Sequence, residues 1–145
     1  MKVIFLDFNG VLDTAHKMDI IDMDNLFILG ELVDKMDAKI VISSSIKNTY
    51  YYAGYHKKVM NCLMDTLINY GLEIYGITPY KETREEEIQE YLKMHSEITD
   101  YLIIDDDYYF ESMKEHMVKL VPQGDGGNGL KDLKKRELKR IFKSM

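Results

Sequence analysis

Residues 3–12 read VIFLDFNGVL, an apolar run that ends in Asp7 and then meets Asn9-Gly10. Val, Ile and Phe are typical of strands, and Asn-Gly is typical of a turn. The stretch therefore predicts a buried strand from Lys2 to Phe8 with a carboxylate near its end. An amide, Asn9, follows two positions later, where a second carboxylate would be chemically useful.

Further short segments repeat this pattern along the chain. Lys39 to Ser43 and Tyr101 to Ile104 are apolar nearly throughout, as expected for strands that are buried on both faces of a sheet. A serine run follows the first, and three aspartates that begin at Asp105 follow the second. Glu73 to Ile77 and Met117 to Val121 are weaker strand candidates.

Segments with helical spacing of apolar residues separate these strands. They predict helices at Met23 to Met36 (with Asp22 or Asp24 as N-cap), Tyr50 to Tyr70, a segment that starts near Glu85-Glu86-Glu87, and a basic helix from Leu130 to Met145. Parallel strands need crossover helices. The alternation therefore predicts one α/β domain over residues 1–145, a doubly wound, Rossmann-like parallel sheet of about five strands with helices on both faces.

Composition narrows the class of protein. The 145 residues are 46% hydrophobic, and the net charge is −6. A negative net charge does not indicate sequence-independent binding of nucleic acid, although a local basic face is compatible with it. The one cysteine, Cys62, is expected on the buried side of its helix as a structural thiol. There is no signal-peptide pattern and no run of the ~18 apolar residues that a membrane span needs. A soluble, cytoplasmic protein without membrane contact is expected.

Polar residues at strand ends should converge, because ligands of doubly wound sheets bind outside the carboxyl ends of the strands. Asp7, Ser43 and Asp105 all lie at such ends. Phosphoryl transfer to a carboxylate needs a set of this kind, in which one Asp attacks phosphorus, a divalent cation neutralises charge, and a hydroxyl and a side-chain cation hold the oxygens.

The order of these motifs resembles that of the haloacid dehalogenase superfamily. The matching segments are FLDFNGVL around Asp7, IVIS ending at Ser43, a basic residue before a helix, and LIIDD ending at Asp106. The resemblance implies that Asp7 is the nucleophile, which forms an aspartyl-phosphate and binds the metal. It also implies that the backbone carbonyl of Asn9 binds the metal and that Ser43, or the adjacent Ser44, binds the phosphoryl group.

The resemblance implies the remaining parts of a magnesium site as well. Asp105 matches a direct metal ligand and Asp106 a second acid that holds a metal-bound water, while Asp107 either assists or faces solvent. Oxygen ligands of this kind suit Mg²⁺. The cation that binds phosphate is Arg84 or Lys81, and Arg84 is favoured because it starts the helix that leads to the last motif.

Asn9 departs from the superfamily pattern. Phosphatases of the superfamily carry Asp at this position, where it protonates the leaving oxygen and then activates water. An amide can do neither, and general acid–base help contributes about 10²–10⁴ in rate. Three explanations stay open: a substitution that traps a ligand, a slow natural enzyme, or a domain that binds phosphate and metal without turnover.

The segments after Ser45 resemble small phosphatase domains of the polynucleotide 3′-phosphatase type, including those fused to RNA repair enzymes. This implies a phosphorylated substrate that is a nucleic-acid end or a nucleotide. The Ser-Ser-Trp-Arg-like segment of that type is here Ser44-Ser45-Ile46-Lys47. The tyrosines at 50, 51, 52 and 55 with His56 either stack on bases or bury their rings at a helix start.

The spacing of the motifs leaves little room for a cap domain. Only a short flap fits between Asp13 and Asp22, and Ile46 to Pro79 hold little beyond one helix and one strand. A site without a lid admits bulky substrates or is closed by a partner subunit, so an oligomer is compatible with the sequence.

Other protein classes share some of these features. Receiver domains share the length and an Asp/Ser/Lys set, but their acidic pair ends the first strand, whereas here Asp105-Asp106 come late. Dehalogenases need a halide cradle and a cap that have no candidate here. The main alternative is a non-catalytic phosphate- and metal-binding or regulatory domain with the same fold.

Overall fold

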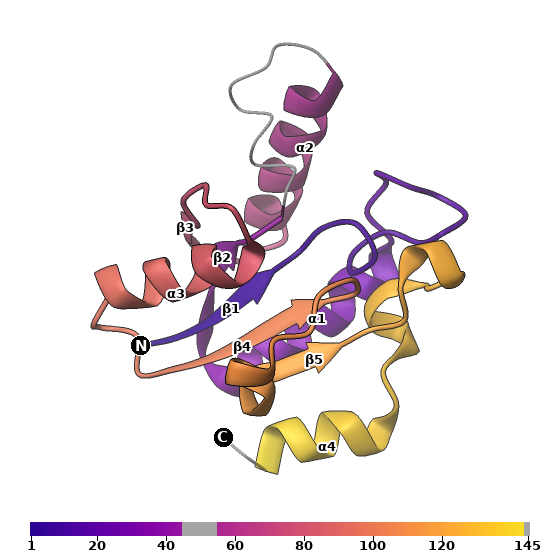
Figure 1. The fold of residues 1–145 in the computed structure, drawn as a ribbon. Coiled ribbons are helices and arrows are strands. Elements are labelled where there is room, and N and C mark those ends of the chain that lie inside the picture. Colours follow the sequence, from indigo (N-terminus) through magenta and orange to yellow (C-terminus); the bar gives the residue numbers. More distant parts are fainter. Residues whose placement is uncertain (45–54, 144–145) are drawn as a thin grey trace.

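The described strands form one parallel sheet. The structure, a computed structural model, describes residues 1–44 and 55–143, without the side chains of Tyr55, His56, Lys135 and Phe142. Its five strands lie in the order β3-β2-β1-β4-β5 (Figure 1). They are β1 (Lys2–Leu6), β2 (Ala38–Ile42), β3 (Ile74–Ile77), β4 (Asp100–Asp105) and β5 (Met117–Lys119). The prediction of a doubly wound α/β fold is confirmed.

The central strand β1 pairs with β2 on one side and β4 on the other. Leu6 is in register with Ile42 of β2 and with Ile104 of β4. The next residue of each strand is therefore polar at the same level: Asp7, Ser43 and Asp105. Hydrogen bonds from Ser43 N to Leu6 O (2.9 Å) and from Asp7 N to Ile104 O (3.4 Å) continue both ladders to this edge.

Alternation along the strands divides the core between the two faces of the sheet. Ile4 and Leu6 belong to the core that contains the apolar sides of α1 (Met23–Met36), α2 (Tyr55–Asn69) and α4 (Lys135–Lys143). Val3 and Phe5 point to the other face, where they pack with α3 (Arg84–Met94). Helices on both faces account for strands that are apolar throughout (Figure 1).

Side-chain caps fix the start of α1 and of α3. Asp22 precedes α1 and accepts a hydrogen bond from Asn25 N (3.1 Å), as one of the two predicted N-caps. Thr83 precedes α3 and accepts from Glu86 N (3.1 Å). Such caps satisfy helix N–H groups that have no partner within the helix. The Thr83 cap places Arg84 in the first turn of α3.

Several predicted boundaries were too generous. The first strand ends at Leu6, the last has only three residues, and the C-terminal helix begins at Lys135, after a separate 3₁₀ turn, η4 (Gly129–Asp132). The described part of α2 begins at Tyr55, so the prediction for Tyr50 to Tyr52, like that for Ser45-Ile46-Lys47, falls outside the described residues. The side chains of Tyr55 and His56 lie outside the description too.

The prediction for Cys62 was wrong, because its thiol is exposed. Met60, Leu63 and Leu67 of α2 are buried in the core. Cys62 precedes Leu63 by one position, which rotates it about 100° around the helix. The thiol therefore faces away from the core.

The flap between β1 and α1 is as short as the spacing predicted. It is closed by an isolated antiparallel bridge between Thr14 and Lys17. No cap domain is present among residues 1–44 and 55–143. Within the same residues, no helix has both the length and the apolar character needed to cross a membrane.

Candidate active site

Three buried carboxylates meet at the carboxyl end of the sheet. Asp7 follows β1, and Asp105 and Asp106 lie at the end of β4. Each offers a carboxylate oxygen that lies within 4.8 Å of the others, and all three residues are buried. Carboxylate oxygens at this spacing suit a hard divalent cation such as Mg²⁺. The cluster contains three of the four metal ligands that were predicted.

Burial and neighbouring charge disfavour the ionised form of Asp7. Burial raises the pKa of Asp7 most, and the charges of Asp105 and Asp106 raise it further. The Arg84 guanidinium and the Phe8 N–H, which donates to Asp7 Oδ1 (2.8 Å), act in the opposite direction. The resulting pKa is about 7. A cation at the cluster would lower it and favour the nucleophilic carboxylate.

Arg84 connects Asp7 to the acidic pair at the end of β4. Its Nη1 donates to Asp105 Oδ2 at 3.0 Å and lies 3.8 Å from Asp7 Oδ1. Its Nε lies 3.6 Å from Glu87 Oε1, and its guanidinium lies over the ring of Tyr108 at 5.2 Å. A buried Arg needs partners of this kind. The charge is therefore fixed beside the two carboxylates, where an incoming phosphoryl group would meet it.

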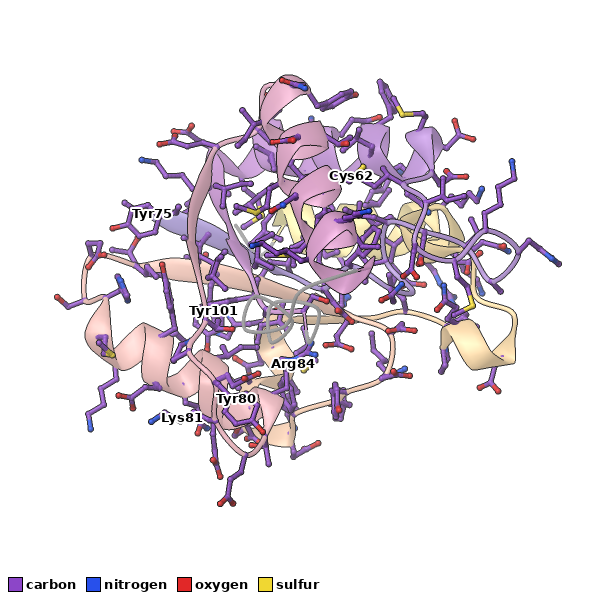
Figure 2. The ribbon with its side chains drawn as sticks, turned by 90° about the horizontal axis from the view of Figure 1, so that it is seen from above. Cys62, Tyr75, Tyr80, Lys81, Arg84 and Tyr101 are labelled. Carbon is purple, nitrogen blue, oxygen red and sulfur yellow. The ribbon has the colours of Figure 1, made fainter. Side chains whose placement is uncertain are left out.

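The structure brings Arg84, and not Lys81, to the carboxylates. Lys81 is exposed and borders a surface depression together with Glu86 and Lys93 on the outer side of α3. Figure 2 shows Arg84 near the middle of the molecule and Lys81 toward its periphery. Of the two candidate cations, the geometry favours Arg84.

Two buried oxygens at this edge have no hydrogen-bond partner. They are Ser43 Oγ and Asp106 Oδ1, the only such side-chain atoms within the described residues. Buried polar atoms without a partner cost about 1–3 kcal/mol each. Asp106 belongs to the carboxylate cluster, and Ser43 follows the residue in register with Leu6, so a bound cation or anion at this edge could satisfy them. The residues present thus fit a divalent cation.

The other oxygens of the acidic pair are already used. Asp105 Oδ1 accepts from the N–H groups of Asp107 (2.9 Å) and Tyr108 (3.1 Å), and Asp106 Oδ2 accepts from Gln123 N (2.9 Å). Burial is the largest cause that raises the pKa of both carboxyl groups. Ser44 is buried beside Ser43, while the Asp107 side chain is exposed. Asp107 therefore contributes its backbone N–H to this site.

Gly10 allows Asp106 to approach the turn after β1. Gly10 has φ +81°, and a Cβ at this position would collide with the Asp106 carboxylate. Only glycine adopts this conformation without strain and leaves the space free. The turn that carries Asn9 and the acidic pair of β4 therefore pack directly on one another.

The Asn9 amide is held by two carboxylates of the flap. Its Nδ2 donates to Asp13 Oδ2 at 2.7 Å and to Asp19 Oδ1 at 2.8 Å. Asp19 has φ +64°, which brings its own N–H to Asp13 Oδ2 (2.8 Å). An amide has the two N–H donors that this pair of acceptors requires, whereas an ionised carboxylate has none. These surroundings fit Asn at position 9.

Asp13 and Gln123 are site residues that sequence reasoning missed. Asp13 is fully buried and also accepts from Gly10 N (2.7 Å) and from Gln123 Nε2 (2.9 Å). It therefore joins the flap, the turn after β1 and the segment after β5. The only signal in the sequence was an acid placed four residues after Asn9, and nothing marked Gln123.

Stability of the metal-free chain should depend on Asp7 and on pH. The raised pKa means that ionised Asp7 destabilises the fold, with a penalty that grows from the ordinary value of 3.8 to about 7 and is complete above it. Asp7→Asn is therefore expected to stabilise the chain at pH 8 with a chelator present, by up to about 4 kcal/mol at ~1.4 kcal/mol per pKa unit. Urea unfolding at pH 4 and pH 8 measures this difference, which should nearly vanish at pH 4.

The control for this measurement is Asp24→Asn, at an exposed acid in the first turn of α1. It should leave stability nearly unchanged at both pH values. A stabilisation by Asp7→Asn that is the same at pH 4 and pH 8 would contradict the assigned electrostatics.

Comparisons with known proteins agree with this geometry. No curated protein and no solved structure matches the chain. The model of one family, described as the HAD domain in Swiss Army Knife RNA repair proteins, matches residues 3–132. That span covers the five strands apart from Lys2 and includes every site residue described above, and it confirms the resemblance read from the motifs. The chain therefore belongs to the family of HAD domains found in Swiss Army Knife RNA repair proteins.

Proposed function

We propose that this chain is a Mg²⁺-dependent phosphatase that acts through an aspartyl-phosphate on Asp7 and takes a phosphorylated nucleic-acid end as substrate. The observation that carries the proposal is the convergence of Asp7 with two buried, unpartnered oxygens, Ser43 Oγ and Asp106 Oδ1. The family supports phosphatase-type chemistry in general and an RNA-repair setting for the substrate.

The proposed reaction has two steps. One oxygen of Asp7 forms a bond to phosphorus while the bond to the leaving oxygen breaks, and water then releases phosphate and restores the carboxylate. Phe8 N–H holds Asp7 Oδ1 (2.8 Å), which leaves Oδ2 for attack. The Ser43 hydroxyl and the Arg84 guanidinium would hold the phosphoryl oxygens, where they oppose the charge of the transition state.

Asp7, Asp106 and Asp105 would hold the cation, with the backbone carbonyl of Asn9. Bound there, Mg²⁺ would reduce the repulsion between the nucleophile and the phosphate. Asp106 offers an oxygen that is already buried and free of hydrogen bonds, whereas both oxygens of Asp105 have protein partners. Asp106 is therefore the carboxylate best prepared to coordinate.

Asn9 sets the expected speed of this chemistry. Its Nδ2 is used by Asp13 and Asp19, and an amide carries no proton that it can exchange with the leaving group. Turnover should therefore be slow for alkoxide leaving groups and less affected for acidic phenols. The same network supports the second candidate, a domain that binds phosphate and metal without turnover, because it holds the amide in place of an acid.

A groove beside the turn would receive the organic part of the substrate. It lies between the flap and α2, has a volume of about 310 Å³, and is lined mainly by apolar side chains, among them Ile20, Met23 and Leu63. Phe8, which precedes Asn9, and Asp19, which accepts a hydrogen bond from Asn9, form part of its wall. An apolar wall with one carboxylate suits a flat, partly polar group such as a base.

The proposed function is tested by phosphate release. The unchanged chain with Mg²⁺ should release phosphate from an aryl phosphate and, more slowly, from an RNA oligonucleotide with a 3′-phosphate. Addition of a chelator should stop both reactions. Binding of Mg²⁺ and inorganic phosphate without any release, also after Asn9→Asp, would favour the non-catalytic domain.

Loss of one carboxylate should weaken metal binding. Asp106→Asn removes the oxygen that is buried without a partner, and we expect it to lower Mg²⁺ affinity at least tenfold, since losing even an outer partner of a metal site costs about 10–100-fold. Asp107→Asn is the matched control, because this neighbouring side chain is exposed. Titration calorimetry measures both. Equal affinities for the two variants would place the cation elsewhere.

A further inference from the structure

The charges of this chain are separated along its length. Residues 131–143 carry seven Lys and Arg side chains and two acidic ones, whereas the rest of the chain carries 12 basic and 23 acidic residues. The overall charge of −6 thus conceals a basic C-terminal segment on an acidic body. Such asymmetry is typical of segments that contact polyanions. This segment also lies almost wholly beyond the part matched by the family, which ends at residue 132.

Four of these cations share one face of α4, which we call the basic face: Arg136, Lys139, Arg140 and Lys143. They follow one another at helical spacing, are all exposed, and surround one surface concavity of about 520 Å³. The opposite side of the helix carries Ile141, which is buried in the core, and Leu138, which packs against it. The basic face therefore points to solvent because the apolar side anchors the helix.

In the part of the chain that the structure describes, the basic face lacks acidic partners. No ion pair joins any of its four side chains to an acid within residues 1–44 and 55–143. Lys131, just before the helix, is paired with Asp22 at 2.9 Å, whereas the four cations of the basic face have no such partner among the described residues. Unpaired like charges on one short helix repel each other. An external anion with several charges would remove that repulsion.

The segment before α4 is attached to the catalytic edge of the sheet. Leu130 N donates to Val11 O (3.0 Å), within the motif that carries Asp7. The buried Asn25 side chain donates to Asn128 O (2.9 Å) and accepts from Lys131 N (2.8 Å). The helix thus starts from a segment tied to the catalytic motif and runs below β5 (Figure 1). The helix from Arg136 to Lys143 is about 10 Å long, which is about the length that three nucleotides occupy along one strand of B-DNA.

We infer that the basic face of α4 binds the phosphate backbone of the RNA strand whose end occupies the active site. This inference rests on the proposed function for the identity of the strand. It assigns to α4 a sequence-independent role: the cations hold the strand at several phosphates, and the active site contacts only the terminal one. Contacts of this kind release counterions and make binding strongly dependent on salt.

The test compares two charge-reversal variants of the full chain. Lys139→Glu/Arg140→Glu changes the basic face, and the matched control Lys93→Glu/Lys114→Glu makes the same change in net charge on exposed residues of α3 and η2 (Glu111–His116). Fluorescence anisotropy with a single-stranded RNA of about ten nucleotides and a 3′-phosphate, within the ~4–16 nucleotides that one small domain covers, measures affinity at several salt concentrations. A chelator prevents turnover of the end.

We expect the α4 variant to lose at least tenfold in affinity at low salt, and the slope of log affinity against log salt to become shallower by about 1.4, at ~0.7 per lost phosphate contact. The control should keep both quantities. Equal affinities for the two variants would overturn the inference. It would also be overturned if the α4 variant lost binding to vesicles of anionic lipid and kept RNA binding.

Failure of the proposed function is visible separately. Hydrolysis of a small aryl phosphate does not involve α4, so the α4 variant should retain the rate of the unchanged chain. Absence of that hydrolysis in the unchanged chain would refute the phosphatase, and the dependence of RNA binding on α4 would still be decided by the salt titration.

Discussion

Replacing Asp7 with Asn is expected to reduce phosphate release by about 10⁴-fold or more, as removal of a nucleophile does in other enzymes. The effect should be this large because both oxygens of Asp105 have protein partners, and the free oxygen of Asp106 is the one assigned to the cation. Release from an aryl phosphate in the presence of Mg²⁺ measures the loss.

Two further observations make the Asp7 result specific. Acid quenching of the unchanged chain during turnover of a ³²P-labelled substrate should leave label on the protein, and Asp7→Asn should leave none. Asp24→Asn, on the exposed first turn of α1, should keep the full rate. Label that persists in Asp7→Asn, or a rate close to that of the unchanged chain, would assign the nucleophile to another residue.

Replacing Asn9 with Asp is expected to raise turnover by about 10²–10⁴-fold on alkyl phosphates and much less on aryl phosphates. The new carboxyl would lie against Asp13 Oδ2 and Asp19 Oδ1, which now accept from the amide at 2.7 and 2.8 Å. Repulsion between like charges should raise the pKa of the new carboxyl. It would therefore carry a proton near neutral pH, which is the form that a general acid needs.

The same variant should lose stability as the pH rises. The pKa of the new carboxyl is raised in the folded state. At low pH the carboxyl is protonated and can donate a hydrogen bond. At high pH it is ionised and can only accept, beside the carboxylates of Asp13 and Asp19, which also only accept. Asn69→Asp, at the exposed end of α2, is the matched control for the change of amide to acid. If Asn9→Asp releases no more phosphate than Asp7→Asn, the domain binds without catalysing.

The strands of this protein could be predicted because each is a short apolar run with a polar end. Asp7, Ser43 and Asp105 come directly after residues that the sheet places in register, so strand ends alone bring them together. Helix α1 was predicted with its observed bounds because the apolar spacing runs from Met23 to Met36 and an Asp N-cap precedes it. Local pattern and tertiary packing point the same way in these elements.

The flap network could not be predicted from local pattern. Asp13 contacts Gln123, which lies far along the chain, and their meeting depends on how the segment after β5 returns to the flap. Cys62 was assigned to the wrong side of α2 because its neighbours are apolar on more than one face, and only packing on the sheet decides which face is buried. Such contacts are set by tertiary structure, and composition does not indicate them.

The central position of β1 also governs when the site can come into existence. This strand pairs with β2 on one side and with β4 on the other, and these two strands lie far apart in the sequence. Pairings between distant segments form slowly, because the intervening chain must be closed into loops first. During synthesis Asp7 leaves the ribosome well before the acidic pair, because Asp105 and Asp106 follow far along the sequence. The phosphoryl chemistry proposed for Asp7 would thereby be confined to molecules in which β1 and β4 have paired.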